Sequence, residues 1–261
     1  MHRVILYLTV VSAVLFLSAC REEAHTRQHV VVLVDASASI APEAFSDAIA
    51  SAQSLIKHLR RGDALSIIPI LGDGSQTQGK ILRFEIALER QAYDADITKV
   101  DTAVRNALAD LRAAVLRKPM PKTDILGAID VACEEFSSYR AEVQQTLIIF
   151  SDLLEDDGRF DFMTAPELAT EATAKRLGQR LAIEKPRVMK VRAYVGMLRS
   201  VDYDRLQTAR RRAVVAFWST LFSRYGAKTM IATDGPGLMK KFLDEDGFDS
   251  EGGGYGHQVQ R

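Results

Sequence analysis

The stretch that decides the fold is VVLVDASASI, residues 31–40. Its first four residues are aliphatic, a pattern typical of a strand that is buried on both faces of a parallel sheet. The residues that follow carry oxygen atoms, at Asp35, Ser37 and Ser39. Because the two serines stand two residues apart, an extended loop places both hydroxyls on one side. An apolar strand that ends in this way predicts a polar binding site at its carboxyl end.

Strand and helix patterns alternate along the rest of the chain. Strands are predicted at 64–71, 81–88, 146–150, 188–197 and 228–232, and helices at about 42–59, 100–115, 125–136, 165–181 and 214–225. This alternation predicts an α/β fold: a doubly wound, mostly parallel central sheet with one antiparallel edge strand and helices on both faces. The antiparallel strand is expected at 81–88, since the glycine-containing turn at 72–75 makes it the second arm of a hairpin.

Two more oxygen-bearing residues are expected at the same edge of the sheet. Asp152 follows the apolar strand 146–150, and Thr123 stands just before the helix that leads to that strand. In open parallel sheets, ligands bind beyond the carboxyl ends of the strands. Asp234 also follows a strand and competes for the place of the second aspartate, but chain order favours Asp152. The expected site consists of Asp35, Ser37, Ser39, Thr123 and Asp152.

This set, D-x-S-x-S followed by a threonine and a second aspartate, resembles the metal-ion-dependent adhesion site of von Willebrand factor A (VWA) domains. The resemblance covers about residues 30–235 and implies a Rossmann-like VWA fold. It also implies that the two serines and the threonine are hydroxyl ligands of a metal ion. The two aspartates would then bind that ion directly or through water.

Such an oxygen-only site suits a hard cation, Mg²⁺ above all, with Mn²⁺ or Ca²⁺ as alternatives. Neutral hydroxyl ligands leave much of the cation's charge uncompensated, which favours a carboxylate arriving from a protein partner. The family often has glycine after the second aspartate, whereas this chain has Leu153 followed by an acidic loop at 155–157. That loop either raises the affinity for metal or repels an acidic ligand.

Bulk composition narrows the function classes. The 34 basic and 34 acidic residues give a net charge of zero, which argues against a nucleic-acid partner. Of the five histidines only His58 falls inside the predicted folded domain, which leaves too few for a histidine-based active site. No G-x-S-x-G, P-loop or G-x-G-x-x-G motif occurs, and we expect no enzyme. The alternatives are a metal-dependent hydrolase or phosphatase, with Glu155 as general base, and an envelope scaffold whose metal site is purely structural.

The amino terminus has the pattern of a secretory signal, with a basic start, an apolar run and small residues before Cys20. Leu17-Ser18-Ala19-Cys20 resembles the lipobox of bacterial lipoproteins, which implies cleavage after residue 19 and acylation of the cysteine. Arg21, in place of aspartate, implies an outer-membrane anchor facing the periplasm. The expected organisation is a signal peptide at 1–19, a tether at 20–29, the VWA-like domain at 30–235 and a flexible tail at 236–261.

Two further features are expected to be structural. With Cys20 acylated, Cys133 remains alone, so no internal disulfide forms, and its place on an apolar helix face predicts a small buried side chain. The basic run Arg210–Arg212 is expected to form a solvated helix face.

Overall fold

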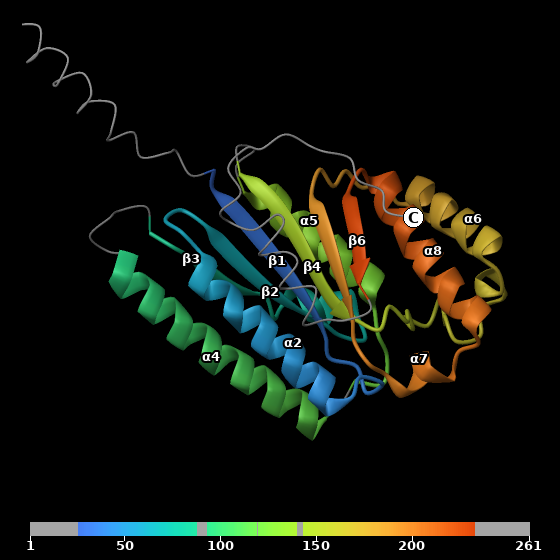
Figure 1. The fold of residues 1–261 in the computed structure, drawn as a ribbon, viewed down its shortest axis with the longest axis horizontal. Coiled ribbons are helices and arrows are strands. Elements are labelled where there is room, and N and C mark those ends of the chain that lie inside the picture. The colour runs from blue at the N-terminus through green and yellow to red at the C-terminus, as the bar shows by residue number, and fades with distance from the viewer. Residues whose placement is uncertain (1–25, 88–92, 119, 140–142, 233–261) are drawn as a thin grey trace, which may run out of the picture.

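The computed structural model describes residues 26–87, 93–118, 120–139 and 143–232. Within them, six strands form one sheet in the order β3-β2-β1-β4-β5-β6 (Figure 1). Every neighbouring pair is parallel except β2 with β3, which lies at the edge. The predicted fold class is therefore confirmed. The strands are β1 (Gln28–Asp35), β2 (Ala64–Ile70), β3 (Leu82–Glu85), β4 (Gln144–Ser151), β5 (Arg192–Met197) and β6 (Lys228–Ala232).

The strand order reverses direction between β1 and β4. From β1 the chain builds outward through β2 and β3, and from β4 it builds outward through β5 and β6 on the other side. β1 and β4 pair directly, with Val34 opposite Phe150 near their carboxyl ends. In a doubly wound sheet this reversal opens a crevice that is the usual place for a ligand. The last residues of β1 and β4 therefore lie at this point of reversal.

Helices cover both faces of the sheet (Figure 1). One face packs against α2 (Pro42–Ser54), the short η1 (Leu55–His58) and α4 (Tyr93–Arg117); the other packs against α5 (Ile125–Ser138), α6 (Glu171–Glu184) and α8 (Thr208–Tyr225). Val31 and Leu33 face the second layer, while Val32 and Val34 face the first, and all four are fully buried. Burial on both faces explains why this strand is a continuous apolar run.

The remaining helical elements are short: α3 (Gly74–Gln78), η2 (Pro166–Leu168) and α7 (Val201–Arg205). The sequence predicted a turn where α3 begins, and it predicted a helix from residue 165, whereas α6 begins at Glu171. There Thr170 and Thr173 form a reciprocal capping box, which fixes the start of the helix.

Several expectations fall outside the described residues: the signal peptide, Cys20, Asp234 and the tail from 236. Within the described ranges, none of the helices has the length and apolar character that crossing a membrane requires. His29 was assigned to the tether, but it lies in β1 and is fully buried.

Candidate functional site

The two aspartates of the expected site stand side by side at the crevice. Asp35 is the last residue of β1, and Asp152 follows directly after Ser151, the last residue of β4. Since β1 and β4 are paired in parallel, both side chains emerge at the same edge of the sheet. Both residues are fully buried, which is unusual for carboxylates without a compensating charge.

Hydrogen bonds connect these aspartates through the two serines. The backbone N–H of Ser37 donates to Asp35 Oδ1 at 2.9 Å, and the hydroxyls of Ser37 and Ser39 are 3.0 Å apart. Ser39 Oγ then donates to Asp152 Oδ2 at 3.1 Å. Four of the five expected residues are thus connected by hydrogen bonds, through the backbone N–H of Ser37 and the hydroxyls of Ser37 and Ser39. The serines lie in the loop between β1 and α2, whose Ala38 N–H donates to the carbonyl of Met120 at 2.8 Å.

Thr123, the fifth expected residue, lies in the loop before α5 and takes no part in the hydrogen bonds that connect the other four. Met120, three residues earlier, forms an isolated bridge with Ser37. Thr123 exchanges both backbone hydrogen bonds with Asp156, at 3.0 and 2.9 Å. Within the described residues, no hydrogen bond joins the Thr123 side chain to the other four. The described contacts therefore connect the loop of Thr123 to the site through Met120 and do not join Thr123 itself to the other four residues.

Two serines that the sequence analysis did not single out support the aspartates. Ser151 Oγ donates to Asp35 Oδ2 at 2.6 Å, and the Ser200 side chain hydrogen-bonds to Asp152. Ser200 follows shortly after β5, the next parallel strand, so its position at a strand end was the signal that would have identified it. Ser151 was hidden because it is the last residue of its own strand, where apolar residues alone were expected.

Burial dominates the electrostatics of the pair. It raises the pKa of Asp152 to about 7, with the nearby Asp35 carboxylate as the second cause, and it also raises the pKa of Asp35. Hydrogen bonds from Ser39 and Ser200 act in the opposite direction on Asp152. Two carboxylates in one buried site repel each other, and a divalent cation between them would remove that repulsion. The donor set is entirely oxygen, so it fits Mg²⁺, Mn²⁺ or Ca²⁺ rather than a softer metal.

The acidic loop after Asp152 does not supply a base to this site. Glu155 is buried, and its Oε2 accepts hydrogen bonds from the backbone N–H groups of Ile125 and Leu126 at the start of α5. Burial raises its pKa well above the usual range, with the charges of Asp124 and Asp157 as further causes. Glu155 thus caps a helix, and its described contacts do not include Asp35 or Asp152.

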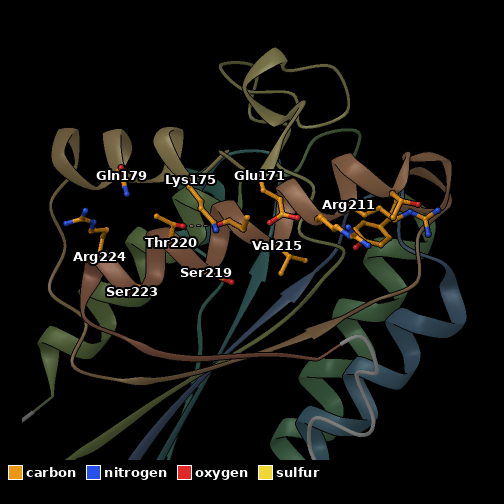
Figure 2. Close-up of a pocket in the computed structure, with 13 residues that line it drawn as sticks. Glu171, Lys175, Gln179, Arg211, Val215, Ser219, Thr220, Ser223 and Arg224 are labelled. Atoms are coloured by element: carbon orange, nitrogen blue, oxygen red, sulfur yellow. Dashed lines mark hydrogen bonds between the residues drawn. The ribbon is translucent and has the colours of Figure 1, made fainter. Parts of the chain in front are cut away.

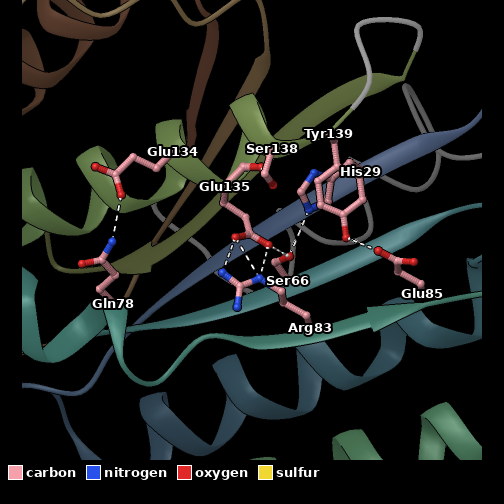
Figure 3. A network of polar contacts seen from close by, with 9 residues as sticks. All are labelled: His29, Ser66, Gln78, Arg83, Glu85, Glu134, Glu135, Ser138 and Tyr139. Carbon is pink, nitrogen blue, oxygen red and sulfur yellow. Dashed lines mark hydrogen bonds and ion pairs between the residues drawn. The ribbon is translucent and has the colours of Figure 1, made fainter.

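A serine and a histidine meet at the opposite edge of the sheet, but they do not form a catalytic pair (Figure 3). Ser66 donates its proton to Glu135 Oε1 at 2.7 Å, so His29 Nε2, 3.0 Å from Ser66 Oγ, must be the donor of that second bond. Arg83 binds the same glutamate through three hydrogen bonds. Since His29 Nε2 donates to Ser66, it cannot act as the general base that takes the serine's proton. The network joins β1, β2, β3 and α5.

A groove of about 830 Å³ runs along the outer side of α6 and α8 (Figure 2). It contains none of the five expected site residues. Arg211 and Arg212 line it, whereas Arg210 donates to the carbonyls of Phe162 and Ala165 at 3.2 and 2.8 Å. Arg211 donates to two further carbonyls, so the basic run is only partly the solvated face that the sequence suggested.

Cys133 is partly buried and packs against the core, and burial raises its pKa to about 11. The thiolate that would react is therefore scarce at neutral pH. This agrees with the structural role expected from the sequence.

No model of a known protein family matches the chain, and no curated protein matches it. Similar solved structures include a von Willebrand factor type A protein from Catenulispora acidiphila, with 14% identity, 83% of this chain and 41% of that chain covered, and a TM-score of 0.46. Manganese-loaded TRAP protein from Plasmodium vivax has 13% identity over 84% of this chain and 72% of that chain, with a TM-score of 0.41. The pilus adhesin SpaC from Lactobacillus rhamnosus GG has 12% identity over 84% of this chain and 29% of that chain, also at 0.41.

These similarities, with identities below 25% and TM-scores below 0.5, assign no function. The fold class rests on the strand order and the single antiparallel edge pair. The chain has a six-stranded, doubly wound α/β fold, and its structural neighbours include a von Willebrand factor A protein.

Proposed function

We propose that this chain is a VWA-like protein of the bacterial cell envelope that binds a protein partner through a divalent metal ion, Mg²⁺ in the first place. The observation that carries the proposal is the hydrogen-bonded series from Asp35 through Ser37 and Ser39 to Asp152, at the point where the strand order reverses. Its four residues come from two segments far apart in sequence. Two carboxylates buried together without a cation of their own are what a divalent ion would neutralise.

The residues present fit binding better than catalysis. The two aspartates and two serines, with Thr123 from the neighbouring loop, would hold the ion and leave a coordination position for an oxygen donor of the partner. The acid that could have served as a general base, Glu155, caps α5 instead. Ser66 and His29 are buried at the far edge of the sheet. We therefore propose a binding module without turnover.

The test is capture of envelope proteins by the purified chain in Mg²⁺ and in EDTA. Thr123→Val removes one proposed ligand hydroxyl and should weaken Mg²⁺-dependent capture about tenfold, the equivalent of ~1.4 kcal/mol. Thr146→Val is the matched control, because Thr146 is also buried but its hydroxyl has no hydrogen-bond partner and lies in β4. Equal capture by both variants, or capture unchanged by EDTA, would contradict the proposal.

A second assay separates binding from catalysis. A panel of phosphatase, esterase and peptidase substrates with Mg²⁺ and Mn²⁺ should show no turnover. Hydrolysis by the wild type that is lost in Asp35→Ala would show that the site is catalytic.

We further propose that Cys20 carries the lipid anchor and that the domain faces the periplasm from the outer membrane. The lipobox-like sequence before the cysteine supports this. Cys20→Ala should move the protein from the membrane fraction to the soluble fraction. Unchanged membrane association of the variant would contradict the anchor.

A further inference from the structure

Three carboxylates that do not belong to the Asp35–Asp152 site meet where α5 begins. Asp124 is the N-cap of α5, and Glu155 and Asp157 lie in the loop after β4. One oxygen atom from each lies within 4.8 Å of the other two. Asp124 is 8% exposed, Glu155 is 1% exposed, and the Asp157 side chain is 3% exposed. Negative charges are thus concentrated in a place that water barely reaches.

One oxygen atom of this cluster has no hydrogen-bond partner among the described residues. Glu155 Oε2 accepts two backbone hydrogen bonds from α5, at 3.0 and 3.1 Å, but Glu155 Oε1 is buried without a hydrogen-bond partner. A buried acceptor without a partner costs about 1–3 kcal/mol, and a charged one costs more. The two amide bonds at the helix N-terminus favour the charged carboxylate. Burial and the charges of Asp124 and Asp157 nevertheless outweigh these bonds and raise the pKa of Glu155. The side chain is therefore held in place with one of its two oxygen atoms unused.

The cations nearby compensate only part of the charge. Arg159 forms an ion pair with Asp157, and its side chain is 55% exposed. Lys122 reaches over Gly158 but makes no ion pair with the three carboxylates in the described structure. Asp124 binds only backbone N–H groups, those of Gly127 and Gly74, at 2.6 and 2.8 Å. Among the described residues, Asp124 and Glu155 therefore form no ion pair, although the Arg159 charge also acts on both of them.

We propose that Asp124, Glu155 and Asp157 form a second divalent-cation site, which binds Ca²⁺. The donors are all carboxylate oxygens, which excludes a site for the softer transition metals. Backbone hydrogen bonds already fix the direction of each carboxylate. Ca²⁺ accepts such irregular geometry, with six to eight oxygen ligands completed by water, whereas Mg²⁺ requires a near-ideal octahedron.

The role of this cation is to hold two segments of the crevice together. Asp124 belongs to the start of α5, and the other two acids belong to the loop after Asp152. The same segments are joined by the paired backbone hydrogen bonds of Thr123 and Asp156. A bound Ca²⁺ links them a second time through side chains.

The experiment is a Ca²⁺ titration of the purified full chain in the Asp35→Ala background, which removes the other proposed metal site. Calorimetry should find one Ca²⁺ per chain, and Ca²⁺ should raise the melting temperature. Adding Glu155→Gln, which keeps the shape of the side chain, should weaken Ca²⁺ binding at least tenfold and abolish the shift. Asp156→Asn is the matched control, because it removes an acid of the same loop that lies outside the cluster.

Asp157→Asn provides a second test at a residue that does not cap α5, and it should also weaken Ca²⁺ binding at least tenfold. The absence of Ca²⁺ binding at millimolar concentration, or Ca²⁺ binding that Glu155→Gln and Asp157→Asn leave unchanged, would overturn the site. A third result would assign Glu155 a different role. If the Asp35→Ala protein does not respond to Ca²⁺ and adding Glu155→Gln leaves its stability unchanged, Glu155 is a protonated side chain that only caps α5. None of these results depends on whether Asp35 and Asp152 bind Mg²⁺.

Discussion

Leu153, directly after the second aspartate of the site, has a φ of 64°, in the left-handed region that side chains other than glycine rarely adopt. It is the only non-glycine residue with positive φ in the described ranges. Trp218 Nε1 donates a hydrogen bond to the carbonyl of Leu153 at 2.9 Å. The backbone N–H of Leu153 donates to Ser151 Oγ at 3.0 Å. The glycine often found here in VWA domains suits this conformation without strain. In this chain, hydrogen bonds and the packing of a fully buried leucine hold it instead.

At this position, the glycine variant should therefore be more stable than the alanine variant, which is the reverse of the usual order. Both variants lose the buried side chain, at a cost of about 2–5 kcal/mol. Alanine keeps the left-handed strain of about 1–2 kcal/mol, whereas glycine relieves it and loses about 0.5–1 kcal/mol through chain entropy. Leu153→Gly should thus be more stable than Leu153→Ala by up to ~1 kcal/mol in urea denaturation. A glycine variant that is clearly the less stable of the two would show that the position is unstrained.

His29 is the second residue whose environment has a measurable consequence. Burial lowers its pKa to about 4, and its Nδ1 is buried without a hydrogen-bond partner. The folded chain therefore keeps it neutral, with the proton on Nε2 for the bond to Ser66. Between pH 6.5 and about 4 the unfolded chain binds a proton that the folded chain does not, so stability falls as the pH falls through this window.

This contribution can be isolated with His29→Gln, which keeps an N–H donor near Ser66 and removes the titration. Between pH 7 and pH 4 the wild type should lose roughly 3 kcal/mol of unfolding free energy more than the variant does. The raised pKa values of Asp35, Asp152 and Glu155 change stability in the opposite direction, but they are common to both proteins. Parallel pH profiles from urea denaturation would show that His29 is not held neutral.

The sequence predicted which residues of the candidate site lie together better than it predicted their contacts. Asp35, Ser37, Ser39 and Asp152 could be predicted because each stands at or just beyond a strand end, where parallel strands share an edge. The hydrogen bond from Ser151 to Asp35 joins two neighbouring strands. It could not be predicted because the sequence does not show which strands pair. The orientation of Glu155 toward α5 was missed for the same reason.

At the scale of the secondary-structure elements, α6 and α8 pack against each other, and Gly178 lies where they meet. A Cβ at this position would come within 2.9 Å of the Phe217 carbonyl and 3.4 Å of the Leu221 nitrogen. The glycine thus allows the backbones of the two helices to approach closely. Both neighbours are backbone atoms of a helix, which cannot move aside as a side chain could.

Gly178→Ala should accordingly destabilise the protein although alanine is the better helix former. Intrinsic helix propensity favours alanine by about 1 kcal/mol, but separating two packed helices costs about 1–3 kcal/mol or more. We expect a lower melting temperature for Gly178→Ala and an almost unchanged one for Gln179→Ala, on the exposed side of the same helix. A stabilised Gly178→Ala variant would contradict the close packing.

Helix boundaries were predicted less well than the helices themselves. The last long helix was expected from 214, but α8 begins at Thr208, because its first turn is polar and is held by arginines that bind backbone carbonyls. Apolar periodicity cannot reveal such a turn. Strand β6 was predicted to begin at 228, where it does begin, since Gly226 ends the preceding helix.

At the scale of the whole molecule, the doubly wound topology places two buried aspartates at the point where the strand order reverses. Neither aspartate has a cationic partner among the described residues; burial raises the pKa of both, and the charge of Asp35 raises that of Asp152 further. The alternation of strands and helices predicted this topology, and the topology explains why residues 117 positions apart in the sequence are neighbours. An ion that binds both of them stabilises the folded state by mass action.

The most direct measurement is calorimetric titration of Mg²⁺ into the wild type and Asp152→Asn, with melting temperatures recorded in parallel. We predict one Mg²⁺ bound in the crevice of the wild type and a melting temperature that rises by about 5–10 °C at a hundredfold excess over Kd. Both effects should be absent in Asp152→Asn and retained in Glu155→Gln. If the wild type binds no Mg²⁺ at millimolar concentration, or if Asp152→Asn binds it equally well, the metal site at Asp35 and Asp152 does not exist.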